Sequence, residues 1–171
     1  MLGNDTKEEV EKRLQIVASA GNLSRADGTV TQVFESRNDY DSNLKLARAV
    51  VGYGHKSIAE HDYLVFALEN VTPIVEQTLI EYRLTSFTIK SRRNVDFRNV
   101  GFYVPEFKDK DGNVLPNNAE LQVLYKNYMQ SLFDKYGELV DEEIPVEDCR
   151  YILPYCYHSN IIMGCDANEL L

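Results

Sequence analysis

The sequence predicts a mixed α and β fold, organised as one domain around one sheet over residues 1–171. The length of 171 residues, with 44% hydrophobic and 26% charged side chains, suits a single globular domain with a substantial core. Segments with helical spacing of apolar residues alternate with segments rich in β-branched and aromatic residues. The chain contains no internal repeat and no low-complexity linker, so nothing in it favours several domains.

The predicted helices are recognised by their caps and their apolar spacing. Asp5 is the expected cap of the first helix, with Glu8 at the position three residues on. Helices are expected after Asp5, over roughly residues 41–53, after Thr72-Pro73, from Asn117 to about Leu139, over Cys149–Leu153 and from Ala167 to Leu171. The third helix has residues at helical spacing at Ile74, Val75, Thr78, Leu79 and Tyr82. The fourth has one apolar stripe, formed by Leu121, Leu124, Tyr125, Tyr128, Leu132 and Tyr136.

The predicted strands are shorter. Thr29–Phe34 is rich in β-branched residues and follows a loop expected over Gly21–Gly28. His61–Val71 is apolar on both of its faces, which predicts a strand buried on both sides. Gly101–Pro105 and Tyr157–Met163 are the other expected extended pieces, and Lys108–Asn113 is a predicted turn.

A basic window lies at residues 83–98. It holds Arg83, Lys90, Arg92, Arg93 and Arg98 against one acid, for a charge of +4, while the whole chain carries −9. Guanidinium groups beside Ser and Thr hydroxyls are suited to binding phosphate, because they are planar and bidentate. The window therefore predicts an anion site, and the alternative is a solvated basic face.

Other classes of function are disfavoured. The acidic balance argues against general binding of nucleic acid, and no apolar run is long enough to span a bilayer. No signal peptide is visible at the N-terminus, so a cytoplasmic protein is expected. Cys149, Cys156 and Cys165 lack metal-binding spacing and are expected to be small apolar residues. No metal site is expected, and His61 is expected to be a core histidine at the start of a strand.

Four separated segments resemble the flavin-dependent thymidylate synthases. Residues 54–61, GHKSIAEH, are similar to the family pattern G-H-x-[ST]-x-x-E-H. Residues 81–94 follow the register of its signature R-H-R-x-x-S-x-N-E-x-S-x-R-Y and keep Arg83, Ser86, Ser91 and Arg93. Arg150–Pro154 is similar to R-x-x-L-P, and Asp166–Leu170 stands where the family has N-A-R-x-L. The resemblance covers most of the chain, from about His55 to Leu171.

The resemblance implies a fold with a mostly antiparallel central sheet flanked by helices. It also implies transfer of a methylene group from methylenetetrahydrofolate to dUMP, with FAD as the hydride carrier, NADPH as the reductant and no protein nucleophile. A homotetramer with clefts between subunits is expected as well. The residues that would bind dUMP are Thr78, Ser91, Arg92, Arg93 and Arg150. The residues that would bind the cofactor are His55, Ser57, Glu60, Tyr82, Arg83, Leu84, Asp166 and Asn168.

Several positions depart from the family pattern. Glu81 replaces the first Arg of the signature, Tyr82 its His, Thr88-Ile89 its Asn-Glu pair and Asn94 its final Tyr. Reversing the charge at an anion contact changes the interaction by several kcal/mol. The chain also ends before the family's C-terminal helical segment. These departures leave an alternative open, a catalytically silent relative that binds nucleotide or flavin or assembles with an active homologue, so enzymatic activity is not assigned from the sequence.

Overall fold

A computed structural model describes residues 5–171. Residues 1–4, which belong to the N-terminal segment in which no signal peptide is visible, lie outside the described residues. The chain forms two compact units. The first unit comprises the chain up to Ala67 together with Tyr82–Phe87 and Ile162–Leu171, and the second comprises Leu68–Glu81 and Thr88–Ile161. Within the described residues, no helix is both long and apolar enough to cross a membrane. The assignment of all residues to one domain stays a prediction.

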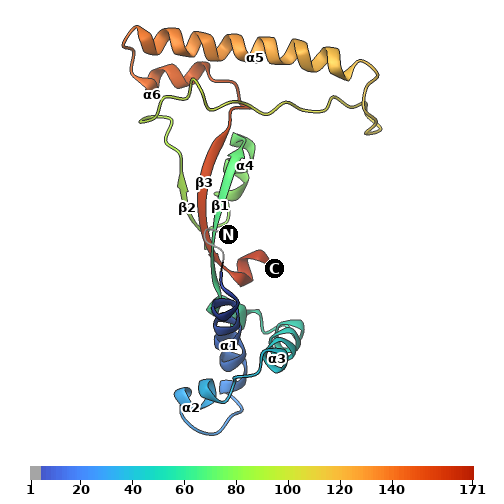
Figure 1. Ribbon diagram of the computed structural model, residues 1–171, viewed down its shortest axis with the longest axis vertical. Helices are drawn as coiled ribbons and strands as arrows, with labels where there is room; N and C mark the ends of the chain where they lie inside the picture. Colours follow the sequence, from blue (N-terminus) through green and yellow to red (C-terminus); the bar gives the residue numbers. More distant parts are fainter. Residues whose placement is uncertain (1–4) are drawn as a thin grey trace. The chain divides into compact units, whose positions relative to one another are not determined.

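Three strands, β1 (Tyr63–Val71), β2 (Ser86–Ile89) and β3 (Ser159–Asp166), form a sheet in the order β1-β3-β2 (Figure 1). Two hydrogen bonds, one near each end of the strand pair, define the register of β1 against β3. Ala167 donates its N–H to the carbonyl of Asp62 at 2.8 Å, and Asn70 donates its N–H to the side chain of Asn160 at 3.1 Å. Residue numbers rise along one strand as they fall along the other, so these strands are antiparallel. The predicted mixed fold with a small antiparallel sheet is confirmed.

The prediction that β1 is buried on both faces is wrong. Exposure alternates along most of the strand, and Tyr63 and Val65 are 53% and 40% exposed. Leu64, Phe66 and Leu68 on the other face are half-buried. Apolar side chains on both faces show that a strand can be buried on both sides, but they do not show that both faces are covered within one chain.

The first unit contains three α-helices (Figure 1). They are α1 (Lys7–Leu23), α2 (Val30–Glu35) and α3 (Tyr40–Gly52), and the 3-10 helices η1 (Lys56–His61) and η3 (Ala167–Leu170) complete this unit. The cap of α1 is Thr6, which forms a capping box with Glu9, one residue later than the expected pair Asp5 and Glu8. Because α1 runs to Leu23, the loop expected from Gly21 begins later. The core of this unit is small and includes Val17, Ala18, Val33 and Ala59.

The strand predicted over Thr29–Phe34 is also wrong, because these residues form α2. Thr29 accepts a hydrogen bond from the backbone of Gln32, and the Gln32 side chain accepts one from the N–H of Thr29 at 2.8 Å. This reciprocal capping box satisfies two backbone donors that a helix start leaves open. The local cap therefore outweighs the preference of β-branched residues for strands.

The second unit contains α4 (Pro73–Leu79), α5 (Asn118–Asp141), α6 (Val146–Cys149) and the 3-10 helix η2 (Arg150–Ile152). Its core cluster consists of Phe97, Phe133, Tyr136, Cys149 and Tyr157. The ring of Phe97 meets that of Tyr157 edge-on at 5.5 Å, and Tyr136 accepts a hydrogen bond from the N–H of Phe97 at 3.1 Å.

The predicted apolar stripes of this unit are buried only in part. On the α5 stripe, Leu124 and Tyr128 are 52% and 63% exposed, whereas Tyr136 is buried, and so is Phe133 outside the stripe. On α4, Ile74 is 61% exposed, whereas Glu76 is 3% exposed.

Candidate functional site

The candidate residues divide between the two units in a simple way. All eight cofactor candidates belong to the first unit, and all five nucleotide candidates belong to the second.

The nucleotide candidates centre on residues 91–95, here called the cradle turn, which follows β2. Lys90 donates its N–H to the carbonyl of Asn160 at 3.0 Å and so ties the start of the turn to β3. Val95 donates its N–H to the carbonyl of Ser91 at 3.1 Å, and the Ser91 hydroxyl accepts the N–H of Arg93 at 3.2 Å. A Ser hydroxyl that accepts a hydrogen bond from the backbone two residues on is a common way to order a turn.

The two arginines of the cradle turn have different surroundings. Arg92 donates from Nη1 to Oε2 of the buried Glu76 at 3.1 Å. Arg93 donates from Nε to Oε2 of Glu147 on α6 at 2.9 Å, and both of these side chains are well exposed, at 65% and 45%. An exposed ion pair contributes about 0–1 kcal/mol, so the guanidinium of Arg93 is readily available to another anion.

Thr78 and Arg150 are the remaining nucleotide candidates. Thr78 lies on the exposed side of α4 and donates its hydroxyl to the carbonyl of Ile74 at 2.9 Å. Arg150 begins η2, three residues after Glu147, and its guanidinium lies 5.4 Å from the ring centre of Tyr151. Glu147 itself is paired with Arg93.

The basic window is neutralised in part by its own unit. Arg98 bonds to Asp96 at 2.6 Å and to Asp141 at 2.8 Å. These hydrogen bonds, that to Asp141 first, raise the pKa of Arg98. Lys90 lies 5.3 Å from the ring centre of Phe97. The window is therefore neither a uniform anion site nor a uniformly solvated stripe, and of the two cradle-turn arginines Arg93 is the more exposed.

The cofactor candidates on η1 and η3 come together in the first unit. Asn168 donates from Nδ2 to Oε1 of Glu60 at 3.2 Å, which joins the two helices. Asp166 caps η3, because its Oδ1 accepts the N–H groups of Asn168 and Glu169 at 2.9 and 3.1 Å. Ser57 is exposed on η1. Asp166 therefore has a clear structural role, whereas Ser57 and the amide of Asn168 are accessible.

Tyr82, Arg83 and Leu84 lie between α4 and β2. All three are exposed, Tyr82 by 50% and Leu84 by 69%, and the carbonyl of Tyr82 accepts the N–H of Thr85 at 3.3 Å. An exposed aromatic and an exposed aliphatic side chain in one short turn offer a flat apolar surface.

His55 lines a hollow of about 630 Å³ in the first unit. Its other walls include the apolar side chains of Leu46, Val50 and Ile58, with Arg25 and Tyr53 among the polar members. Arg25 and Tyr53 are not among the site residues predicted from the sequence. Arg25 follows Ser24 within the expected loop, and a cation beside a hydroxyl is the signal that could have marked it.

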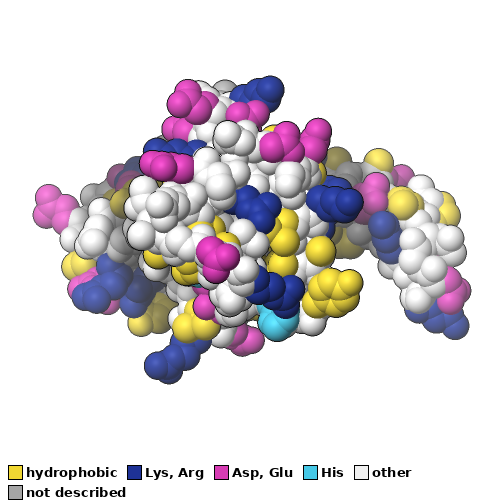
Figure 2. Space-filling model, turned by 90° about the horizontal axis from the view of Figure 1, so that it is seen from below, with side chains coloured by type: hydrophobic (Ala, Val, Ile, Leu, Met, Phe, Trp, Pro, Cys, Tyr) yellow, Lys and Arg dark blue, Asp and Glu magenta, His cyan; other side chains and the backbone are white. Residues whose placement is uncertain are grey.

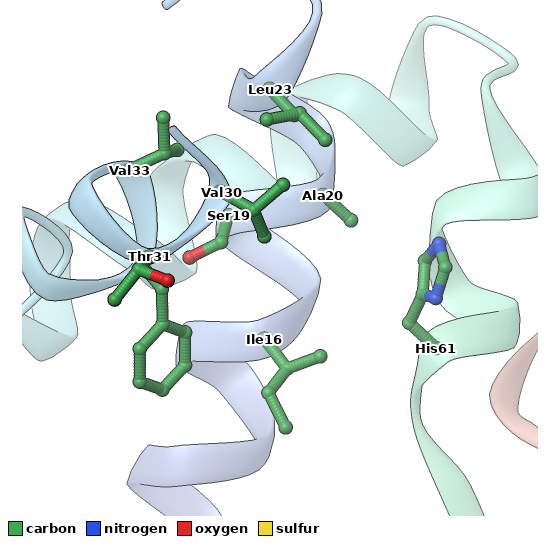
Figure 3. A pocket seen from close by; sticks show the side chains of 9 residues that line it. Ile16, Ser19, Ala20, Leu23, Val30, Thr31, Val33 and His61 are labelled. Carbon is green, nitrogen blue, oxygen red and sulfur yellow. The ribbon is translucent and has the colours of Figure 1, made fainter. Parts of the chain in front are cut away.

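A second hollow of about 450 Å³ lies between α1 and α2 and is mostly apolar (Figure 3). Figure 3 shows the imidazole of His61 across from Ile16 and Val30. His61 is exposed, so the prediction of a core histidine is wrong. The chain enters β1 just after this residue, and the packing of the unit does not extend over it.

The second unit has an apolar groove of about 770 Å³ in which Ile74 and Val75 of α4 meet three tyrosines. The tyrosines are Tyr103, Tyr125 and Tyr155, and Cys156 also lines the groove. Burial, followed by the neighbouring Cys156, raises the pKa of Tyr125 well above its usual range. Figure 2 shows hydrophobic side chains exposed among charged ones on the face turned to the viewer.

The chain was compared with known proteins. The family model described as Thy1, thymidylate synthase complementing protein, matches residues 7–171. The flavin-dependent thymidylate synthase of Thermococcus onnurineus is 32% identical over 94% of this chain, and that of Geobacter sulfurreducens is 31% identical over 91%. The chain spans 64% of the length of each of these two relatives.

Two solved structures are similar in fold. One is a UMP/dUMP methylase, PolB, from Streptomyces cacaoi bound with 5-Br dUMP, at 26% identity and a TM-score of 0.65, covering 90% of this chain and 69% of that one. The other is the flavin-dependent thymidylate synthase ThyX from Helicobacter pylori complexed with FAD and dUMP, at 19% identity and a TM-score of 0.64, covering 92% of this chain and 76% of that one. The family match over nearly the whole chain, together with this fold, shows that the chain belongs to the Thy1 family, the flavin-dependent thymidylate synthases.

Proposed function

We propose that this chain carries out the reaction of its family, the FAD-dependent and NADPH-dependent methylation of dUMP to dTMP with methylenetetrahydrofolate. Membership in the family and the names of the relatives support this proposal. We place the protein in the cytoplasm and propose that it works as a homotetramer. Because the chain spans 64% of the length of those relatives, the proposal concerns the reaction to which these residues contribute.

The observation that carries the proposal is the cradle turn. Its backbone is ordered by the Ser91 hydroxyl, and the guanidinium of Arg93 is exposed and paired with the surface carboxylate of Glu147. Glu147 stands where another anion could bind, because a carboxylate and a phosphate oxygen accept the same N–H groups. In this proposal Arg93 and Ser91 hold the dUMP phosphate, and Thr78 and Arg150 complete the nucleotide contacts.

The residues of the first unit fit a flavin dinucleotide. The hollow beside His55 offers a cation, Arg25, for a diphosphate group, and an aromatic ring, Tyr53, with aliphatic walls for a planar ring system. Ser57, Glu60 and Asn168 add hydrogen-bonding groups. Tyr82, Arg83 and Leu84 supply an exposed surface suited to the flavin ring, and Asp166 orients Asn168. Bound FAD would supply the hydride chemistry, and these residues bind and orient it.

One observation supports a second candidate function, in which the protein binds nucleotide but does not catalyse the reaction. Ile89 is half-buried in β2 at the signature position where the family has Glu, and its aliphatic side chain cannot accept a hydrogen bond from a pyrimidine. Glu81 is exposed at the position of the first Arg. The similarity to the thymidylate synthases favours the family reaction over this candidate.

Binding of dUMP by calorimetry tests the proposal. Arg93→Met should weaken binding by about 10-fold to 100-fold, because a charge-assisted hydrogen bond contributes about 1.5–3 kcal/mol. Arg48→Met, at an exposed position of α3 in the first unit, is the matched control and should leave binding unchanged.

Two further measurements separate the candidates. A visible absorption band of bound oxidised flavin tests the cofactor site, and release of tritium from 5-tritiated dUMP with NADPH and methylenetetrahydrofolate tests turnover. Equal dUMP affinity of the wild type and Arg93→Met would contradict the nucleotide site. Binding of dUMP and flavin without tritium release would favour the second candidate.

A further inference from the structure

The second unit contains a buried acid to which the proposed nucleotide site assigns no role. Glu76 lies on α4, and its side chain is 4% exposed. A carboxylate removed from water to this extent is strongly destabilising unless a cation or hydrogen bonds accompany it. Its partner is Arg92, whose Nη1 lies 3.1 Å from Oε2. Within residues 5–171, Oε1 has no hydrogen-bond partner, so the compensation of this charge depends on Arg92.

Arg92 has a second contact, with the ring of Tyr157. Its guanidinium carbon lies 5.5 Å from the ring centre, and Tyr157 is 4% exposed. Guanidinium groups stack on aromatic faces, and the attraction increases where water is excluded. Tyr157 in turn belongs to the core cluster with Phe97. Arg92 thus ties the cradle turn to α4 through Glu76 and to the core through Tyr157.

The neighbouring Arg93 has neither contact. Its side chain is 65% exposed, compared with 36% for Arg92, and its partner Glu147 is a surface residue. A phosphate that drew Arg92 away from Glu76 would leave that carboxylate buried and unpaired. A phosphate that recruited Arg93 would only replace one exposed carboxylate, which costs much less.

We infer that Arg92 is a positioning residue, held by Glu76 and Tyr157, which fixes the cradle turn so that Arg93 and Ser91 meet the nucleotide phosphate. The part of this inference that concerns the nucleotide rests on the proposed function. Arg92 was predicted to bind the phosphate, and in this inference it supports the turn instead. The buried Glu76 is the residue that holds Arg92 in place.

The first test needs no ligand. Amide hydrogen exchange is measured at Val95, which donates to the carbonyl of Ser91. Glu76→Gln and Arg92→Met should each speed its exchange by about 10-fold or more, since both release the turn. Arg93→Met should change it by less than about 2-fold.

Two more variants distinguish local release of the turn from general unfolding of the protein. Glu76→Met/Arg92→Met removes both charges, so it leaves no unpaired carboxylate, yet the turn should still exchange quickly. Arg92→Lys keeps the ion pair and should restore most of the protection. Unchanged exchange at Val95 in Glu76→Gln and in the double variant would overturn the inference.

The second test is the affinity for dUMP, where the two roles of Arg92 predict opposite signs. If Arg92 positions the turn, Glu76→Gln weakens dUMP binding, by about fivefold, because the turn loses its anchor. If Arg92 contacts the phosphate directly, the same change frees a cation for the ligand and strengthens binding. Equal or tighter binding by Glu76→Gln would overturn the inference. If the wild type binds no dUMP while the exchange results hold, the proposed function fails and the support of the turn by Arg92 stands.

Discussion

At the scale of residues, Glu147 and a nucleotide phosphate compete for the same guanidinium. Glu147 accepts from Nε of Arg93 at 2.9 Å, and this ion pair is exposed. Glu147→Gln should therefore raise the affinity for dUMP by about 2-fold to 5-fold, because the lost pair contributes at most about 1 kcal/mol. Titration calorimetry at low salt measures this increase.

Asp148→Asn provides the matched control for that variant. It removes the same charge from the neighbouring residue of α6, which is exposed. A general gain from lower negative charge would appear in both variants, whereas competition for Arg93 appears only in Glu147→Gln. Equal gains would show that Glu147 acts through the net charge of the surface.

The sequence allowed part of the candidate site to be predicted. The hydroxyl and cations of residues 91–93 could be recognised as a phosphate-binding pattern, and they do lie in one ordered turn. The partner of Arg92 could not be predicted, because Glu76 lies 16 residues away and occupies a helix position that is exposed in most amphipathic patterns. Arg25 and Tyr53 were missed for a related reason, since a hollow formed by α1, α3 and η1 brings them to His55.

At the scale of elements, α2 shows how a short cap decides a local structure. Thr29→Ala should lower the free energy of unfolding by about 0.5–2 kcal/mol, because it removes the side-chain oxygen that caps α2. Thr31→Ala is the matched control, since Thr31 is exposed within the same helix. Urea denaturation of both variants measures the difference. Equal stability of the two variants would mean that the cap contributes little.

The hairpin that begins at Phe107 is stabilised by hydrogen bonds to a carboxylate, and this stabilisation depends on pH. Asp109 accepts N–H groups of Asp111 and Asn113 at 2.9 Å each. These hydrogen bonds, that from Asn113 first, hold the pKa of Asp109 below its ordinary value of 3.8. A lowered folded-state pKa means that the stabilisation is present above the ordinary value and is lost as pH falls through the folded-state pKa.

Titration of the Asp109 carboxyl by NMR checks this directly. The amide signal of Asn113 should move with the same midpoint, and Asp109→Asn should abolish that movement. Asp111→Asn, an exposed acid in the same turn, should leave it in place. A titration midpoint of Asp109 at 3.8 or above would contradict this stabilisation by hydrogen bonds.

Most elements could be predicted, but the burial of individual positions on them often could not. Caps and apolar spacing located α1, α3, α4 and α5 and the strands β1 and β3 to within a few residues. Burial of a face depends on what covers it, and that information lies in distant segments. The spacing along α4 is compatible with an inward Ile74, yet the contact of Arg92 with Glu76 turns a different side toward the unit.

At the scale of the whole molecule, the sheet leaves an apolar face uncovered in the first unit. Tyr63 and Val65 of β1 are 53% and 40% exposed, and Ile162 of the adjacent β3 is 49% exposed. Contiguous apolar side chains on a sheet are typical of surfaces that bind another protein, because leaving them in water forgoes about 25 cal/mol per Å². A β1 strand that is apolar on both faces is consistent with burial of its second face by another copy of the chain.

We therefore expect the protein to sediment well above the 19.6 kDa of one chain at micromolar concentration, with four copies as the proposed state. Ile162→Glu should shift the distribution to smaller species, because a charge would be buried without a partner in the interface. Asn127→Glu, which adds the same charge at an exposed position of α5, should leave the distribution unchanged. Far-UV circular dichroism of both variants confirms that each still folds. A wild-type protein that sediments as a 19.6 kDa monomer would contradict the proposed assembly, and the uncovered face of β1 and β3 would then need a different partner.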